Sequence, residues 1–310
     1  MIAPIILRDL GSSSEMVIEP SAGCVATSWK VDGEEVLALP SPREDFLRSV
    51  RTGGIPLLYP YANRLRSDQF EVARKPVDLR VDENLKRDPS GFPIHGLLLR
   101  WGEWELSRQS ESRLEASIKW SAHPRLMAPY PFPHTLKLTW ELGVEECEAG
   151  REATLKVTTT IDANEGSSVP IAFGWHPYLA VGDIASARVE LPARKSIALG
   201  SNGLPSLNPL QAPWIPASSE PVGGNQDALF ELSSDVAQRV ITVVDGSRRT
   251  ILSFDAGYMC LQLYSPEGKS FACLEPMSAP TSALTDGAIV LPAGSRSQAV
   301  FQIRRRLSLA

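Results

Sequence analysis

The sequence contains few cysteines and no closely spaced pair of them. Four cysteines occur among 310 residues, at positions 24, 147, 260 and 273, and none stands in a C-x-x-C pattern. This spacing excludes the usual structural zinc sites and the small disulfide-framework class. Cys260 and Cys273 lie in apolar stretches, so we expect both to be buried small hydrophobic residues.

Long apolar runs and an excess of basic charge are also missing. No apolar stretch approaches the roughly 20 residues of a membrane span, and residues 1–9 lack the positively charged segment that begins a signal peptide. A net charge of −5, from 31 basic and 36 acidic residues, argues against nucleic-acid binding. The sequence therefore predicts a cytoplasmic protein that binds neither membranes nor nucleic acids, and it gives no indication of an oligomeric state.

Motifs for nucleotides, metals and serine nucleophiles are absent as well. The chain has no G-x-G-x-x-G after a strand, no P-loop and no G-x-S-x-G elbow. Its four histidines show no i, i+2 or i, i+4 spacing, and no H-E-x-x-H occurs. We therefore expect neither a cofactor nor a bound metal.

What the chain does have is alternation with a period of two residues. Apolar and polar residues alternate over residues 114–120, 136–140 and 155–161, as in strands with one buried face. Further expected strands are residues 187–191, 240–244, 251–254, 259–264 and 299–303. Helical periodicity is scarce, and 25 prolines and 22 glycines interrupt the chain as turns between short strands would. The pattern predicts an all-β sandwich or barrel built mainly from antiparallel pairs.

The best candidate for a domain boundary is the segment 200–224, which is rich in Pro, Ser, Gly and Asn. Because expected strands lie on both sides of it, a long surface loop is the better interpretation. We therefore predict one domain over residues 1–310.

Two residues are candidates for proton transfer. His176 follows an apolar stretch and precedes Pro177, and a side chain with a pKa near neutrality suits acid–base chemistry. A buried ring hydrogen-bonded to backbone is the alternative. Glu275 follows the apolar residues 270–274, where burial would raise its pKa from about 4.3 towards the range of a general base. A carboxylate that caps a loop is the alternative for Glu275.

Other polar residues are candidates for substrate binding. Asn63 and Arg64 end an apolar stretch, and their fork-shaped side chains suit hydroxyls or an anion. His95 and Asp227 either contact a ligand or bind backbone at a turn. Tyr178, like Trp175, either covers the apolar face of a sugar or belongs to the core.

In this order, the segments resemble the aldose 1-epimerase (galactose mutarotase) family. The resemblance rests on residues 54–64, His95-Gly96 with Trp101 after it, residues 174–178 (Gly-Trp-His-Pro-Tyr), Asp227 and Glu275-Pro276. It spans nearly the whole chain, and the ordered set is more specific than any single motif. The resemblance implies a large antiparallel β-sandwich, with Glu275 as general base and His176 as general acid. It also implies that His95, Arg64 and Asp227, with Asn63 as a weaker candidate, bind a small-molecule sugar.

Two segments depart from the usual galactose mutarotase pattern. Residues 53–56 (Gly-Gly-Ile-Pro) and 92–97 (Phe-Pro-Ile-His-Gly-Leu) look more like relatives that act on hexose 6-phosphates. A phosphate needs at least two convergent cations or backbone donors, and Arg48, Arg51, Arg64 and Arg66 are the candidates.

Three functions thus remain open. The first is an aldose 1-epimerase that opens and recloses the ring of a hexose by acid–base catalysis. The second is a hexose-6-phosphate mutarotase, and the third is a sugar-binding protein without catalysis.

Overall fold

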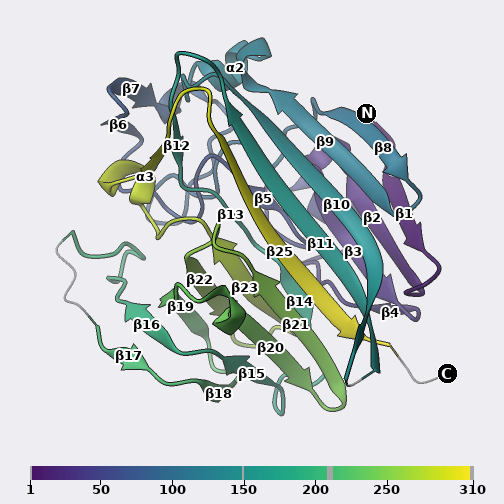
Figure 1. Cartoon of the computed structure of the whole chain (residues 1–310). Helices are drawn as coiled ribbons and strands as arrows, with labels where there is room; N and C mark the ends of the chain where they lie inside the picture. Colours follow the sequence, from purple (N-terminus) through teal and green to yellow (C-terminus); the bar gives the residue numbers. More distant parts are fainter. Residues whose placement is uncertain (1, 149, 208–211, 308–310) are drawn as a thin grey trace.

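Nine strands form the largest antiparallel sheet in the computed structural model, which describes residues 2–148, 150–207 and 212–307. In spatial order they are β18 (Ser218–Pro221), β15 (Arg188–Leu191), β20 (Val240–Asp245), β21 (Arg248–Phe254), β25 (Arg296–Arg306), β11 (Gly150–Ala163), β10 (His134–Cys147), β9 (Arg113–Lys119) and β8 (Glu105–Ser110). Figure 1 shows β10, β11 and β25 as long neighbouring strands across the front of the molecule. β10 and β25 alternate buried and less buried residues over part of their length, because one face of the sheet packs on the core, whereas β11 is buried along most of its length.

The second large sheet carries most of the residues that the sequence singled out. Its strands are β17 (Trp214–Ile215), β16 (Arg194–Ile197), β19 (Gln226–Leu232), β22 (Cys260–Ser265), β23 (Phe271–Met277), β13 (Gly174–Trp175) and β5 (Leu57–Leu58), with β14 (Tyr178–Ala180) also paired to β23. The indole of Trp175 links the two sheets, because its ring centroid lies 5.1 Å from that of Trp140 and 5.6 Å from that of Phe301. The architecture is therefore a large antiparallel β-sandwich, which confirms the expected fold class.

Smaller elements complete the fold. A four-stranded sheet contains β1 (Ile5–Asp9), β2 (Ser14–Glu19), β3 (Val25–Val31) and β4 (Glu34–Glu35), and two-stranded ribbons join β12 (Val169–Ile171) to β24 (Ile289–Leu291) and β6 (Gln69–Val72) to β7 (Lys75–Asp78). The helices are α1 (Arg43–Arg48), α2 (Pro124–Met127) and α3 (Ala283–Asp286), with the 3₁₀ turns η1 (Pro20–Ala22), η2 (Leu79–Val81), η3 (Trp120–Ala122) and η4 (Val236–Gln238). Among the described residues, no helix is long and apolar enough to cross a membrane.

The structure corrects two expectations about strands. The segment 200–224 is not loop throughout, because it contains β17 and the edge strand β18; residues 208–211 lie outside the described part. Short edge strands rich in Ser and Pro leave little periodicity to detect. Glu275 does not follow its strand but lies inside β23, which continues through Pro276 to Met277.

Two expectations about single residues can also be checked. Cys260 and Cys273 are free and buried, as expected. His134, which adjoins Pro133 and is therefore expected in a loop or at a strand edge, does open β10, but it is fully buried: its Nδ1 lies 2.6 Å from the carbonyl oxygen of Phe132 and its Nε2 lies 2.5 Å from the hydroxyl of Tyr59.

Candidate active site

An interruption in the second sheet creates the site. β13 pairs with β23 at Met277, and β14 pairs with it again at residues 271–273. Between these two pairings the chain leaves the sheet at His176 and Pro177, opposite residues 274–276 of β23. The imidazole of His176 therefore meets the carboxyl group of Glu275 where the ladder is broken.

The segment that begins with β5 lies between the two histidine-bearing segments. Leu58 pairs with Gly174 on one side, and Tyr59 forms a bridge with Gly96 on the other. This arrangement brings the rings of His95 and His176 together edge to face, with centroids 5.4 Å apart. Two segments about 80 residues apart in the chain thus contribute to one site.

Two glycines permit this close packing. Gly54 has a φ of +63°, and a Cβ there would lie 2.0 Å from the carbonyl oxygen of Ala26. Gly96 has a φ of +73°, and a Cβ there would lie 2.2 Å from the carbonyl oxygen of Tyr59. Only glycine avoids both the left-handed strain and the overlap. The glycines of the Gly-Gly-Ile-Pro and His-Gly segments therefore serve backbone packing at the site.

Nε2 of His176 lies 3.2 Å from Oε1 of Glu275, and the two side chains are only 5% and 3% exposed. Burial raises the pKa of Glu275 well above its ordinary value, and the carboxylate of Asp227 adds to this shift while Arg64 opposes it. Burial also lowers the pKa of His176, and the positive charge of Lys86 lowers it further. The contact is an ion pair only when His176 is protonated, so these shifts favour a carboxylic acid hydrogen-bonded to a neutral imidazole.

The ring of Tyr178 is stacked on the imidazole of His176, with centroids 4.6 Å apart and planes at 11°. Its hydroxyl is hydrogen-bonded to that of Thr52 at 2.7 Å, and the residue is 5% exposed. This geometry makes Tyr178 a support for the histidine. Trp175 is fully buried, and its Nε1 donates to Thr159 at 3.0 Å, which places it in the core and not in the site.

A chain of polar contacts connects the other predicted residues. Nδ2 of Asn63 donates to Oε1 of Gln262 at 3.5 Å, and Nε2 of Gln262 donates to the carboxylate of Asp227. Gln262 lies directly across the β22–β23 ladder from Glu275, and only 2% of it is exposed. The sequence analysis missed Gln262, although period-two counting along β22 from an expected site strand would have placed it beside Glu275.

Asp227 is the exposed end of this chain of contacts. It lies opposite Tyr264 in the β19–β22 pairing. Partial burial of its carboxyl group raises its pKa, whereas Arg64 and the hydrogen bond from Gln262 act in the opposite direction. The site therefore has a buried floor at His176 and Glu275 and an open edge at Asp227.

Arg64 is held at the edges of its guanidinium group. Nε donates to Oδ2 of Asp88 at 2.6 Å, and Nη1 donates to Oδ1 of Asn63 at 3.1 Å. The side chain of Arg64 is 21% exposed and that of Asp88 only 3%. The positive charge of Arg64 contributes to the pKa shifts of Asp227, Glu275 and His95.

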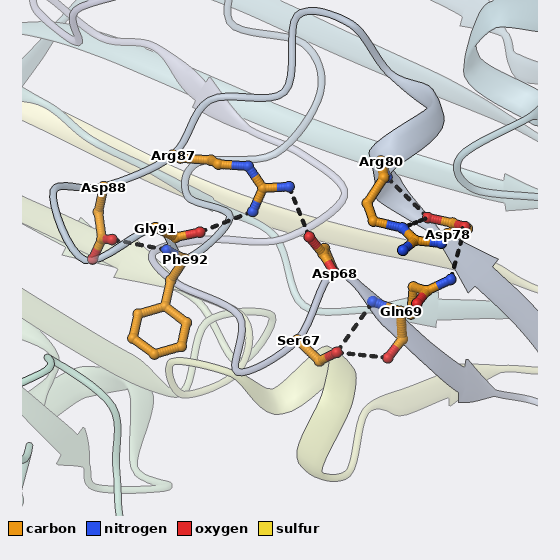
Figure 2. A network of polar contacts seen from close by, with 9 residues as sticks. All are labelled: Ser67, Asp68, Gln69, Asp78, Arg80, Arg87, Asp88, Gly91 and Phe92. Carbon is orange, nitrogen blue, oxygen red and sulfur yellow. Dashed lines mark hydrogen bonds and ion pairs between the residues drawn. The ribbon is translucent and has the colours of Figure 1, made fainter.

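Asp88 is itself fixed by the loop that contains it. Its Oδ1 accepts hydrogen bonds from the backbone amides of Ser90 and Phe92, both at 2.9 Å. Arg87 reinforces the loop by donating to the carboxylate of Asp68 at 2.7 Å and to the carbonyl of Gly91 at 2.8 Å (Figure 2). The loop thus orients the carboxylate that holds Arg64.

Lys86 is a second residue that the sequence analysis missed. It forms no hydrogen bond or ion pair through its ammonium group within the described chain, and its charge lowers the pKa of both His95 and His176, after burial itself. It lines a cavity of about 580 Å³ together with Gly96, Arg100 and Arg125. No sequence pattern marks a lone lysine of this kind.

The site includes two residues with strained backbone and two unpaired ring nitrogens. Asn63 has a φ of +52° and His95 a φ of +69°, and the amide of His95 donates to the carbonyl of Asn63 at 2.9 Å. Left-handed conformations of non-glycine residues cost about 1–3 kcal/mol each and occur preferentially at functional sites. Nδ1 of His95 and Nδ1 of His176 are buried without a partner in the described residues, which leaves them available to a ligand.

A metal has no evident place here. Among the residues that the structure describes, no group of three or more His, Cys, Asp or Glu side chains is arranged to hold a metal ion. The side chains at the site instead offer one acid–base pair and several hydrogen-bonding groups, which suits proton transfer on a hydroxylated ligand.

The chain belongs to the aldose 1-epimerase family, a family of isomerases with mutarotase activity. The family model for aldose 1-epimerase matches residues 10–304, which is nearly the whole chain. This match confirms the resemblance that the ordered motifs indicated.

Solved structures agree at the level of the fold. The Slr1438 protein from Synechocystis sp. PCC 6803 is 22% identical with a TM-score of 0.78, over 99% of this chain and 96% of that one. A galactose mutarotase-like protein from Clostridium acetobutylicum is 19% identical with a TM-score of 0.74, over 96% and 94%. A putative aldose 1-epimerase from Escherichia coli K12 is 17% identical with a TM-score of 0.73, over 99% and 100%. At these identities the likeness shows the shared β-sandwich.

Proposed function

We propose that the protein interconverts the α and β anomers of an aldohexose, with Glu275 and His176 as its acid–base pair. The observation that carries this proposal is the buried 3.2 Å contact between Nε2 of His176 and Oε1 of Glu275. Their pKa values are shifted in opposite directions, upward for the carboxyl and downward for the imidazole. The family to which the chain belongs supports the same reaction class.

The pair supplies the protons that the reaction needs. Moving one proton from the Glu275 carboxyl to Nε2 of His176 gives a carboxylate and an imidazolium without changing the net charge. Glu275 then removes the proton of the C1 hydroxyl while His176 donates one to the ring oxygen, and the bond between C1 and that oxygen breaks. Rotation about C1–C2 turns the aldehyde, and reclosure returns both protons by the reverse transfers. Each such acid or base typically raises the rate by a factor of about 10²–10⁴.

The surrounding residues would bind and orient the sugar. We assign His95, Arg64 and Asp227 to its hydroxyl groups, with Asn63 as a further donor. Nη2 of Arg64 has no hydrogen bond recorded among the described residues, so it is available to a sugar oxygen. Tyr178 acts on the sugar through His176, because its own hydroxyl is engaged by Thr52.

Polarimetry tests the proposal. Freshly dissolved α-D-glucose and α-D-galactose should lose their excess rotation faster with the wild-type protein than without it. Glu275→Gln and His176→Asn should each reduce the catalysed rate by about 10²-fold or more. Near-full rates in both variants would show that this pair is not the acid–base couple.

A phosphorylated hexose is the second candidate substrate, and Lys86 is the observation that favours it. The four arginines predicted from the sequence do not form a free cluster. Arg64 pairs with Asp88 and Arg66 with Asp286, Arg48 lies near Glu44 and Asp45, and Arg51 is exposed. Lys86 instead has no counter-ion among the residues that the structure describes, and its positive charge acts on both histidines.

Comparing glucose 6-phosphate with glucose tests this candidate. A hexose-6-phosphate mutarotase would show a higher kcat/KM for the phosphorylated sugar, and Lys86→Met would remove that preference while keeping turnover of glucose. Equal effects of Lys86→Met on both sugars would reject a phosphate-binding role. Tight sugar binding without accelerated mutarotation of either substrate would support the sugar-binding protein instead.

A further inference from the structure

A short loop far from the catalytic strands in sequence covers one side of Arg64. Residues 199–205, here called the strap, close on themselves through a bridge between Leu199 and Pro205 and a hydrogen bond from the amide of Gly200 to the carbonyl of Leu204 at 2.9 Å. Leu204 is 3% exposed, so the strap is anchored by an apolar contact. The strap is therefore an ordered element with its own internal hydrogen bonds.

Arg66 connects the strap to the segment that carries Asn63 and Arg64. Its Nη2 donates to the carbonyl oxygen of Pro205 at 2.7 Å, while the same guanidinium is paired with Asp286. Leu199 packs against an apolar cluster that includes Leu58 of β5. Both contacts fix the strap against the segment that carries Asn63 and Arg64.

The backbone of Gly203 lies against the face of the Arg64 guanidinium group. A Cβ on Gly203 would lie 2.8 Å from Nη1, 2.9 Å from Cζ and 3.0 Å from Nε. Three nearly equal distances mean that the glycine stands over the plane of the group and not beside it. Asp88 and Asn63 hold two edges of that plane, so a side chain at position 203 would push the guanidinium out of its present hydrogen-bonded position.

We propose that Gly203 is a positioning residue for Arg64, and that the strap fixes this guanidinium for its contact with the sugar. The inference rests on the proposed function in assigning Arg64 to the substrate. It predicts that any side chain at position 203 displaces Arg64 and weakens sugar binding more than the chemical step. The strap thereby couples the loop 199–205 to the affinity of the site.

Gly203→Ala tests the proposal, with Gly268→Ala as its matched control. Both glycines have a φ of +72°, but nothing lies within 4 Å of a Cβ on Gly268, which lies between β22 and β23. The two variants therefore carry the same backbone strain, so any larger loss of melting temperature in Gly203→Ala reports its contact with Arg64. Only Gly203→Ala should raise KM, by about tenfold, because it disturbs a charged hydrogen-bonding group. Its kcat should stay within about threefold of the wild type.

NMR spectroscopy can follow the position of the Arg64 guanidinium group without an activity assay. The ¹H–¹⁵N resonance of the Arg64 Nε–H group, assigned by its loss in Arg64→Lys, should shift in Gly203→Ala and stay in place in Gly268→Ala. Arg66→Met, which frees the carbonyl of Pro205 without adding a Cβ, should shift the same resonance even if Gly203→Ala fails to fold.

The outcomes separate the two proposals. An unmoved Nε–H resonance in Gly203→Ala and Arg66→Met would overturn the positioning role, and so would an equal rise in KM in both glycine variants. A wild-type protein without mutarotase activity would remove the proposed function, while the resonance would still decide whether the strap positions Arg64. In an Arg64→Lys background, the effect of Gly203→Ala on KM should shrink to less than about twofold, because the planar group is gone.

Discussion

The imidazole ring of His176 lies nearly parallel to the phenol ring of Tyr178, with 4.6 Å between centroids. The hydroxyl of Tyr178 is held by Thr52, on the segment that precedes β5. Three segments of the chain, namely residues 174–178, the segment of Thr52 and strand β23, therefore determine where the imidazole lies relative to Glu275. A ring fixed in this way needs little reorganisation before proton transfer, which favours catalysis.

Removing the ring of Tyr178 should impair turnover more than removing its hydroxyl. Tyr178→Phe keeps the stacked ring, so we expect kcat within about threefold of the wild type, whereas Tyr178→Leu should lower kcat by about tenfold or more because His176 loses its support. Mutarotation rates at saturating sugar measure the difference. An equal loss in both variants would mean that the hydroxyl, and not the ring, is what matters.

Two charge changes should move the pH dependence of kcat in opposite directions. Burial is the main cause of the raised pKa of Glu275, and Asp227 raises it further while Arg64 lowers it. The pair works with one shared proton, so activity falls at low pH where a second proton binds, and the acid limb reports an apparent pKa of the pair. Asp227→Asn should therefore move the acid limb to lower pH, and Arg64→Gln should move it to higher pH.

Profiles of kcat from pH 4 to pH 8 at saturating sugar provide the measurement. The acid limb of Gly268→Ala should coincide with that of the wild type, since this glycine carries no charge and lies in the turn between β22 and β23. Shifts of the same sign in Asp227→Asn and Arg64→Gln would contradict electrostatic control of Glu275.

His134 should make the fold sensitive to acid. Burial is the main cause that lowers its pKa to about 4, whereas in the unfolded chain it is near 6.5. Between these values the unfolded state binds one more proton, so stability is fully present above pH 6.5 and is lost as the pH falls towards 4. The slope amounts to as much as about 1.4 kcal/mol per pH unit.

Comparing variants isolates this contribution from those of His95 and His176. In urea titrations between pH 7 and pH 4.5, His134→Asn should show a shallower fall of the unfolding free energy with pH than the wild type. Tyr59→Phe removes the hydroxyl partner at 2.5 Å but keeps the imidazole, so its slope should match the wild type. Identical slopes in His134→Asn and the wild type would refute the assignment.

The sandwich could be predicted because its longest strands alternate cleanly. Residues 155–161 fall within β11, and residues 114–119 of the expected strand 114–120 fall within β9, while Trp120 begins the turn η3. β18 left no such pattern, since Ser218–Pro221 pairs only at the edge of that sheet. Period-two alternation arises where one face of a strand is buried and apolar. Prediction from alternation therefore fails for an edge strand that is mostly polar.

The site could be predicted only as far as residue type and motif order reach. His95, His176 and Glu275 were found beside prolines and glycines, and the structure brings them together. Gln262 and Lys86 were missed, because their relevance comes from facing Glu275 across a ladder and from lacking a counter-ion. The position of Gln262 could have been followed from the alternation along the neighbouring strand β22, whereas the isolation of Lys86 depends on segments distant in the chain, which a single sequence does not encode locally.

Gly96 should be far less tolerant of a side chain than Gly91, five residues earlier. Both have positive φ, +73° and +88°, but a Cβ at Gly96 would overlap the backbone of Tyr59, whereas nothing lies within 4 Å of one at Gly91. Left-handed strain alone costs an alanine about 1–2 kcal/mol. Gly91→Ala should therefore lose about that much unfolding free energy, and Gly96→Ala should lose several kcal/mol more and displace His95. Urea denaturation measures both losses. The mutarotation rate of Gly96→Ala should fall even where its free energy of unfolding is still positive and the variant is folded. Equal losses in the two variants would show that the segment around His95 can move away from Tyr59 without cost.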